Sequence, residues 1–386
     1  MNASEASYPT LGVLQCEAKG VLPFTEAAYC RRLSIAGRKH GIHVMVFSPL
    51  WIHWNNHTVH AFVYTKSGWE RQNLPLPALA YDRCTYTDNR QYRKTRAAIA
   101  RMMEQANVRL LGVGLRGKWE IYRSLHNDSY LSPILPPTRL FTGVANLVDQ
   151  LSRFQEGLFL KPHGGTHGKS TLHIHLHRNS EEETGSKLIS SPLELRGRDD
   201  NNEAIHHLFP YPQEGFAWIE RFVGNRKFII QPYLSLATQE GEPFDIRVLM
   251  QKDENGRWDF TGMAARIGQP NSVTSNLHGG GRAVPVIPFL ASQFEPNHGQ
   301  RLIKQLRQYS KYIPPLLEAQ YGRISEIGLD FGIDLDARLW LLEVNSKPGR
   351  SVFRQTGEHE AALKSVENPI LYARHMLVRY LRRVSS

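Results

Sequence analysis

Two acids and one amide near the C-terminal end of the chain could together hold a metal ion. Asp330 lies before a short polar turn, and Glu343 and Asn345 lie in the apolar segment after it. Side chains alternate along a strand, so Glu343 and Asn345 leave from one face, and a hairpin would bring Asp330 close to that face. Two carboxylates and an amide oxygen suit Mg²⁺ that is shared with substrate phosphates. The pattern predicts a metal site, and an inert, solvated sheet end is the alternative interpretation.

The residues that follow Asn345 favour the metal site. A serine, Lys347, a proline and a glycine come next, so a cation and a tight turn leave the strand directly beside the expected ligands. Such an exit is unusual for an inert sheet edge, and it could serve a second substrate.

A glycine-rich loop between two expected strands could hold phosphates. Lys161 precedes Gly164, Gly165 and Gly168. The glycines let the backbone fold over a ligand and point N–H groups at phosphate oxygens, and Lys161 adds a positive charge. The loop is not a Walker A motif, because its Gly-Lys-Ser continues into an alternating strand pattern instead of a helix. A plain glycine hairpin is the alternative.

A buried strand is expected at residues 228–234, and it contains Gln231, Pro232 and Tyr233 near its end. Proline has no backbone N–H, so neighbouring backbone groups can serve a planar base. An ordinary strand end is the alternative.

Two arginines in strand patterns could act on a phosphoryl group. Arg247 and Arg266 both lie in such patterns, and Asn276 lies in a glycine-rich loop that follows them. Arginine suits the spreading charge of a transferred phosphoryl group. A surface ion pair is the alternative for each arginine.

Three histidines alternate on one expected strand face at His173, His175 and His177. Neutral imidazole is a good metal ligand. No carboxylate or thiol accompanies these histidines in the sequence, which favours an exposed polar face. The polar stretch at residues 178–203 is expected to be a loop.

The pattern of elements predicts three parts. Residues 1–115 alternate strands and helices, which predicts a mainly parallel sheet. Residues 116–240 predict a smaller α+β unit. Residues 241–386 predict an antiparallel sheet with one crossing helix near residues 300–320 and a basic amphipathic helix at residues 368–384.

Composition narrows the class of protein. The chain has 386 residues and a net charge of +11. It has no apolar run of the roughly 18 residues that a membrane helix needs. It also has no secretory signal, so we expect a cytoplasmic protein. Cys16, Cys30 and Cys84 form no CxxC pair, which favours ordinary thiols over a zinc or disulfide site. Basic residues cluster between residues 90 and 123 and favour attraction to anions, but no nucleic-acid motif accompanies them.

Taken in order, these motifs resemble the ATP-grasp superfamily. The resemblance covers residues 115–352 and depends on a lysine after a linker, the Lys-Pro-x-Gly-Gly loop, the Gln-Pro-Tyr strand, Asp-x-Arg, and above all an Asp followed by Glu-x-Asn-x-x-Pro-Gly. Residues 244–253 and 325–334 are similar more narrowly to the YheC/YheD family of endospore coat-associated proteins.

The resemblance implies an α/β and α+β protein of the ATP-grasp fold, in which an N-terminal α/β domain precedes two α+β lobes with ATP between them. The implied ATP ligands are Lys118, Lys161, Gly164, Gly165, Gly168, Gln231, Pro232 and Tyr233. The implied ligands of one or two Mg²⁺ ions, or of Mn²⁺, are Asp330, Glu343 and Asn345. The catalytic candidates are Arg247, Arg266 and Asn276, and the candidates for a substrate carboxylate are Lys347 and Arg350.

The implied activity is an ATP- and Mg²⁺-dependent ligation of a carboxylate to an amine through an acyl-phosphate, with unknown substrates. The resemblance also implies association with the spore, with coat components or an acidic polymer as further partners. A spore-associated structural protein that binds nucleotide without turnover is the alternative. A third hypothesis, a nucleic-acid-binding protein, has only the positive net charge to support it. Gln231 departs from the family pattern, because adenine-holding strands often carry an acid there.

Overall fold

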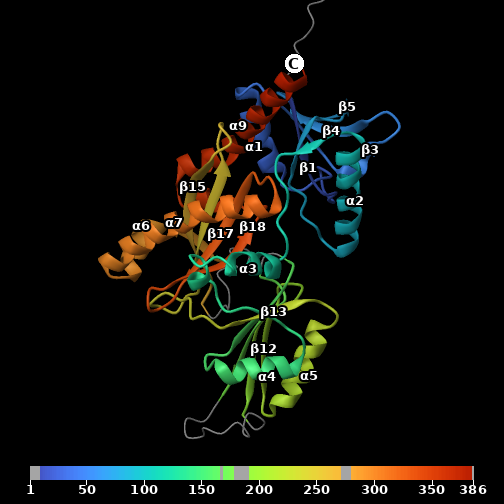
Figure 1. Ribbon diagram of the computed structural model, residues 1–386. Helices are drawn as coiled ribbons and strands as arrows, with labels where there is room; N and C mark the ends of the chain where they lie inside the picture. The colour runs from blue at the N-terminus through green and yellow to red at the C-terminus, as the bar shows by residue number, and fades with distance from the viewer. Residues whose placement is uncertain (1–8, 166–167, 178–190, 271–279, 385–386) are drawn as a thin grey trace, which may run out of the picture.

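The computed structural model describes residues 9–165, 168–177, 191–270 and 280–384. These residues form three β-sheets with helices on their faces (Figure 1). The fold is therefore of the mixed α/β and α+β class that the sequence predicts. None of the described helices is long and apolar enough to span a membrane.

The first sheet has seven strands in the order β3-β4-β2-β1-β6-β7, with β5 paired to β4. Its strands are β1 (Thr10–Leu14), β2 (His43–Phe47), β3 (Ile52–His53), β4 (Thr58–Tyr64), β5 (Trp69–Pro75), β6 (Leu79–Asp82) and β7 (Arg109–Leu110). β1 is parallel to β2 and β6, and β6 is parallel to β7, as the alternation of strands and helices predicts. β4 pairs antiparallel with β2, β3 and β5, so the prediction of a mainly parallel sheet is right for only half of the strand pairings.

Helices cover both faces of the first sheet because alternate side chains of its inner strands point to opposite sides. Val44 and Val46 of β2 pack with α1 (Ala27–Lys39) on one face, and Met45 of β2 packs with α2 (Asn89–Gln105) on the other. Cys16, Cys30 and Cys84 are buried free thiols in these cores, as expected.

The second sheet has six strands in the order β12-β11-β10-β9-β13-β8. Its strands are β8 (Arg139–Leu140), β9 (Leu158–Pro162), β10 (Thr171–Leu176), β11 (Leu193–Arg198), β12 (Ala204–Phe209) and β13 (Phe228–Pro232). α4 (Val144–Arg153) and α5 (Pro212–Val223) cover one face, where Leu172, Ile174 and Leu195 point into the core. The other face carries the alternate, polar residues of β10 and β11.

The prediction of a loop over residues 178–203 is wrong for its last part. β11 is an inner strand that pairs with β10 on one side and β12 on the other. Only Leu193 and Leu195 supply its large apolar side chains, and Gly197 lies against the backbone of Thr171. The charged residues between them point to the other face and hide the strand pattern in the sequence.

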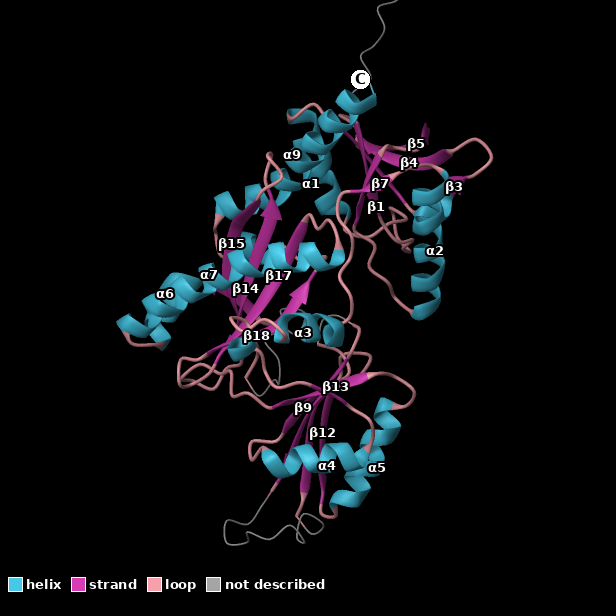
Figure 2. Ribbon diagram, in the orientation of Figure 1, coloured by secondary structure: helices cyan, strands magenta, loops and turns pink. Residues whose placement is uncertain are grey.

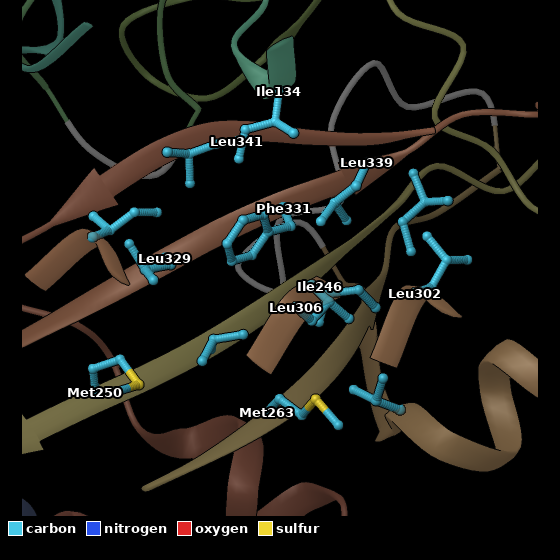
Figure 3. Close-up of a cluster of buried hydrophobic side chains, with 14 of the residues drawn as sticks. Ile134, Ile246, Met250, Met263, Leu302, Leu306, Leu329, Phe331, Leu339 and Leu341 are labelled. Atoms are coloured by element: carbon cyan, nitrogen blue, oxygen red, sulfur yellow. The ribbon is translucent and has the colours of Figure 1, made fainter. Parts of the chain in front are cut away.

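The third sheet is antiparallel, in the order β16-β15-β14-β17-β18. Its elements are β14 (Phe244–Lys252), β15 (Trp258–Ile267), β16 (Arg282–Pro285), β17 (Glu326–Ile333), β18 (Leu339–Asn345), α6 (Val286–Gln293) and α7 (Pro296–Tyr321). α6 and α7 pack on one face, where Ile246, Phe331 and Leu306 belong to the largest core (Figure 3). α8 (Ser351–Gln355) packs on the opposite face through Phe353.

Two segments join these units. α3 (Lys118–His126) and the turn η2 (Ser132–Ile134), which the sequence places with residues 116–240, contribute Ile121, Leu125 and Ile134 to the core of the third sheet. The C-terminal helix α9 (His359–Val384) begins nine residues earlier than the predicted residue 368, and its Ile370 and Ala373 pack with α1 in the first core (Figure 2). The helix therefore fixes the first sheet to the third.

Candidate functional site

A cavity of about 730 Å³ lies between the second and third sheets. Figure 2 shows the third sheet above the second, with α3 between them. Of the residues proposed from the sequence as ATP, Mg²⁺, catalytic or substrate ligands, thirteen line the cavity: Lys118, Lys161, Gly165, Gly168, Gln231, Pro232, Tyr233, Arg247, Arg266, Asp330, Glu343, Asn345 and Lys347. The structure therefore brings together residues that are separated by more than 200 positions in the sequence.

The acids and the amide form one wall of the cavity. Asp330 on β17 lies directly opposite Glu343 on β18, and Asn345 lies opposite Gly328. Directly opposed side chains of an antiparallel pair share a face, and Asn345 Nδ2 donates a hydrogen bond to Asp330 Oδ2 at 3.2 Å. The hairpin geometry predicted from the sequence is confirmed. A bulge after Asp330 inserts Leu342 as an extra residue in β18.

Two buried arginines hold Asp330. Arg247 on β14 bonds both carboxylate oxygens, with Nη2 at 2.9 Å from Oδ2. Arg266 on β15 lies 3.1 Å from the same Oδ2 and bonds Asp245 through Nε and Nη2 at 2.6 Å each. Burial alone would raise the pKa of Asp330, but the two guanidinium charges outweigh it and lower that pKa to about 2. Asp330 is thus an anion at neutral pH, and the arginines form buried ion pairs, not surface ones.

Two lysines face this wall from the side of the second sheet. Lys118, in the first turn of α3, lies 3.3 Å from Glu343 and donates to Gly165 O at 2.8 Å. Lys161, on β9, donates to Leu342 O at 3.3 Å. Burial, helped by the charge of Lys118, lowers the pKa of Lys161 to about 8. Lys118 pairs with Glu343, and Asp330, the other acid that acts on Lys161, is already held by two arginines. This excess of cations favours an anionic ligand.

The glycine loop closes the end of β9. Gly165 and Gly168 adopt positive φ angles of 130° and 68°, which glycine tolerates and most residues do not. Both residues line the cavity, whereas Gly164 does not. Asn276 lies outside the described residues.

Gln231 and Pro232, at the end of β13, and Tyr233 after them line another part of the cavity. The Gln231 side chain is turned to Thr138, with Nε2 at 2.8 Å from Oγ1. Tyr233 stacks on His173 of β10, with ring centroids 3.6 Å apart. Burial lowers the pKa of His173 to about 4, so this ring is neutral at physiological pH.

Sequence reasoning missed several lining residues. His173, Arg196 and Phe159 belong to the face of the second sheet that is turned to the cavity. The alternation of His173 with apolar neighbours was visible, but it indicated only a polar face. Arg196 could not be found, because its strand was not predicted.

The two candidates for a substrate carboxylate, Lys347 and Arg350, follow β18 and lie in different environments. Lys347 lines the cavity, and its Nζ donates to Asp82 Oδ1 at 2.7 Å and to Cys84 O at 2.8 Å, at the end of β6. Arg350 is buried outside the cavity lining, where it bonds Glu326 and the Tyr81 hydroxyl. The expectation that Arg350 holds a substrate carboxylate is wrong for this structure, because its guanidinium group is buried away from the cavity that would receive the substrate.

A buried network around Arg350 connects the first and third sheets. Arg83, next to β6, bonds Glu26 at 2.8 Å and Glu326 at 3.2 Å. Glu326 also accepts from Tyr81 at 2.5 Å and Gln251 at 2.9 Å. The network fixes the end of β6, and with it Asp82, beside the Lys347 exit.

Comparisons with known proteins decide the family. A model described as YheC/D like ATP-grasp matches residues 107–376. The chain belongs to this ATP-grasp family. The chain is 28% identical over 344 residues to the endospore coat-associated protein YheC of Bacillus subtilis. The aligned residues cover 88% of this chain and 90% of that relative.

Solved structures confirm the ATP-grasp fold. D-cycloserine synthetase DcsG has a TM-score of 0.52 and 12% identity, over 96% of this chain and 99% of that chain. D-alanyl-alanine synthetase A from Vibrio cholerae has a TM-score of 0.51 and 14% identity, over 94% and 98% of the two chains. At these identities the likeness concerns the fold.

Proposed function

We propose that this ATP-grasp protein is an ATP- and Mg²⁺-dependent ligase that activates a carboxylate as an acyl-phosphate and joins it to an amine. The observation that carries this proposal is the arrangement within one cavity. Two lysines and a glycine loop lie on one side, and Asp330, Glu343 and Asn345 lie on the other. The two solved structures named above are synthetases by name, which supports the same reaction class.

The lysines and the loop would bind the ATP phosphates. Lys118 and Lys161 reach the same region from α3 and β9. Gly164, Gly165 and Gly168 would supply backbone N–H groups and cover the phosphates, which excludes water from a reactive acyl-phosphate. The adenine base would lie against the segment of Gln231, Pro232 and Tyr233, where the Tyr233 ring and Leu234 line the cavity.

Glu343 and the Asn345 amide fit a hard cation, and Asp330 would share its oxygens between that cation and Arg247. Glu343 has a side chain that is 27% exposed, and its ion pair is with Lys118. The Asn345 amide nitrogen points to Asp330, so its oxygen is the atom for a ligand. An all-oxygen set of this kind suits Mg²⁺ or Mn²⁺. When bound, Mg²⁺ would offset the charge of the transferred phosphoryl group.

The carboxylate and amine steps need no side-chain nucleophile. A substrate carboxylate oxygen attacks the γ-phosphorus and ADP leaves; the amine then attacks the acyl carbon, phosphate leaves, and the amine loses a proton. Arg266 uses Nε and Nη2 for Asp245 and Asp330, so we assign Nη1 to the phosphoryl oxygens. Arg247 would position Asp330, Asn276 would assist in the same region, and Lys347 would face the substrate carboxylate.

ADP release tests this proposal. Wild-type protein is incubated with millimolar Mg-ATP and a panel of amino acids and peptides, next to Glu343→Gln and the control Glu360→Gln, whose side chain is 83% exposed on α9. We expect substrate-dependent ADP release from the wild type and the control, and none from Glu343→Gln. ADP release that is equal in all three proteins would overturn the assignment of Glu343.

A coat-associated structural protein that binds nucleotide without turnover is the second candidate, and the name of the relative YheC favours it. Both candidates predict that Mg-ATP raises the melting temperature, because a ligand of the native state stabilises that state. Binding without ADP release across the whole panel would favour this candidate over the ligase.

A further inference from the structure

Two histidines and a glutamate meet on the second sheet, on the face that is turned away from α4 and α5. His175 on β10 lies directly opposite Glu194 on β11. His177 follows the last residue of β10, in backbone that still bonds to Pro192 O, so its side chain returns to the same face as His175. One ligand atom from each residue lies within 4.8 Å of the others. Among the described residues, no other three His, Cys, Asp or Glu side chains bring their ligand atoms this close together.

The sequence interpretation of these histidines was wrong in one respect. It favoured a bare polar face because no carboxylate accompanied them. Glu194 is that carboxylate, and it lies on the strand that the sequence did not reveal.

The distances within the cluster suit a small metal ion. His177 Nε2 lies 3.0 Å from Glu194 Oε2. Zn²⁺ binds such atoms at 2.0–2.2 Å, so two ligand atoms of a tetrahedral ion lie about 3.4 Å apart. The pair must therefore open by a few tenths of an ångström, and the exposed ring of His177 is free to turn by that amount.

The second oxygen of Glu194 is held by other groups. Oε1 accepts from Arg196 Nε at 2.6 Å and lies 2.8 Å from His206 Nε2. These contacts fix the orientation of the carboxylate and direct Oε2 to His177. Partners of this kind orient metal ligands in proteins and tune their affinity.

We propose that His175, His177 and Glu194 form a binding site for a divalent transition-metal ion of the Zn²⁺ class, distinct from the all-oxygen Mg²⁺ wall. Imidazole nitrogens with one carboxylate select such ions over Mg²⁺. Three protein ligands leave one position of a tetrahedral ion open to water or substrate. The site lies two residues along β10 from His173, which lines the cavity, and it does not depend on the proposed ligase activity.

Zinc titration of the full chain by calorimetry tests the site. The variants are His177→Ala and Glu194→Gln. The matched control is His60→Ala, because His60 contacts His53 on the first sheet with ring centroids 4.6 Å apart but is not part of a cluster of three ligands among the described residues. We expect one Zn²⁺ per chain with a Kd of roughly 1 µM or below, weakened more than about tenfold in both variants and unchanged in the control.

Two further measurements make the outcome decisive. Co²⁺ should give the visible absorption of a tetrahedral ion in the wild type and lose it in His177→Ala, and millimolar Mg²⁺ should not displace Zn²⁺. His177 is exposed, so His177→Ala should retain the wild-type melting temperature without metal. The proposal is overturned if Zn²⁺ binds equally well to His177→Ala and the wild type, or if the wild type takes up no Zn²⁺ at roughly 100 µM.

Discussion

Replacement of Lys161 by methionine should change stability and nucleotide binding in opposite directions. Lys161 is buried in the cavity wall, and its pKa falls from 10.5 to about 8. A shift of this size corresponds to about 3 kcal/mol of destabilisation while the lysine is charged. Methionine keeps the aliphatic stem and removes the charge, so the ligand-free variant should be more stable by about 1–3 kcal/mol at pH 7. Loss of the hydrogen bond from Lys161 to Leu342 O reduces this gain.

The pH dependence of this effect has a defined sign. Because the folded-state pKa is the lower one, the unfolded chain holds the proton more tightly. The charge penalty is complete below pH 8 and disappears as the pH rises from about 8 to 10.5. The stability advantage of Lys161→Met should therefore shrink over this window. Mg-ATP should bind the variant more weakly than the wild type, since the variant lacks a cation for the phosphates.

Urea unfolding between pH 7 and 10, with and without Mg-ATP, checks both effects. The control is Lys364→Met, which removes an exposed lysine of an i, i+4 pair on α9 and should change stability by only a few tenths of a kcal/mol. A loss of stability in ligand-free Lys161→Met at pH 7, or an unchanged affinity for Mg-ATP, would refute the reasoning.

Three further predictions concern the pH response, the base pocket and the buried network. ATP affinity of the wild type should fall about 25-fold between pH 7.5 and 9.5, because Lys161 must be charged to bind phosphate, and Lys161→Arg should show no such fall in a fluorescence competition assay. Tyr233→Ala, which removes the stack on His173, should weaken ATP binding about tenfold without altering its Mg²⁺ dependence; calorimetry with and without Mg²⁺ would contradict this if only the Mg²⁺ effect changed. Glu326→Gln should destabilise the protein by about 3–5 kcal/mol, because Arg350 loses its buried acid; a thermal shift no larger than that of Glu360→Gln would show that the network contributes little.

The predictable part of the site is the part that depends on local periodicity. The strand period of two placed Glu343 and Asn345 on one face, and the short polar turn brought Asp330 opposite Glu343. The same rule placed Lys161 and the loop glycines at a strand end. The alternation of strands and helices likewise predicted the parallel core of the first sheet.

The rest depends on contacts between distant segments. Arg350 looked like a substrate ligand, but its partners are Glu326, 24 residues away, and Tyr81, 269 residues away. β11 has only Leu193 and Leu195 as large apolar residues, so its strand pattern was too weak to detect, and Glu194 was missed with it. The packing of α9 on α1 likewise joins the two ends of the chain, which no local pattern can indicate.

Trapping with hydroxylamine tests the acyl-phosphate most directly. Wild-type protein and Glu343→Gln are incubated with Mg-ATP, a pool of amino acids and peptides, and hydroxylamine, which converts an acyl-phosphate to a hydroxamate. An ATP-dependent ligase predicts hydroxamate that forms together with ADP in the wild type, at the expense of the amide product, and none with Glu343→Gln. Bound Mg-ATP with ADP formation but no hydroxamate from the wild type would contradict an acyl-phosphate at this site.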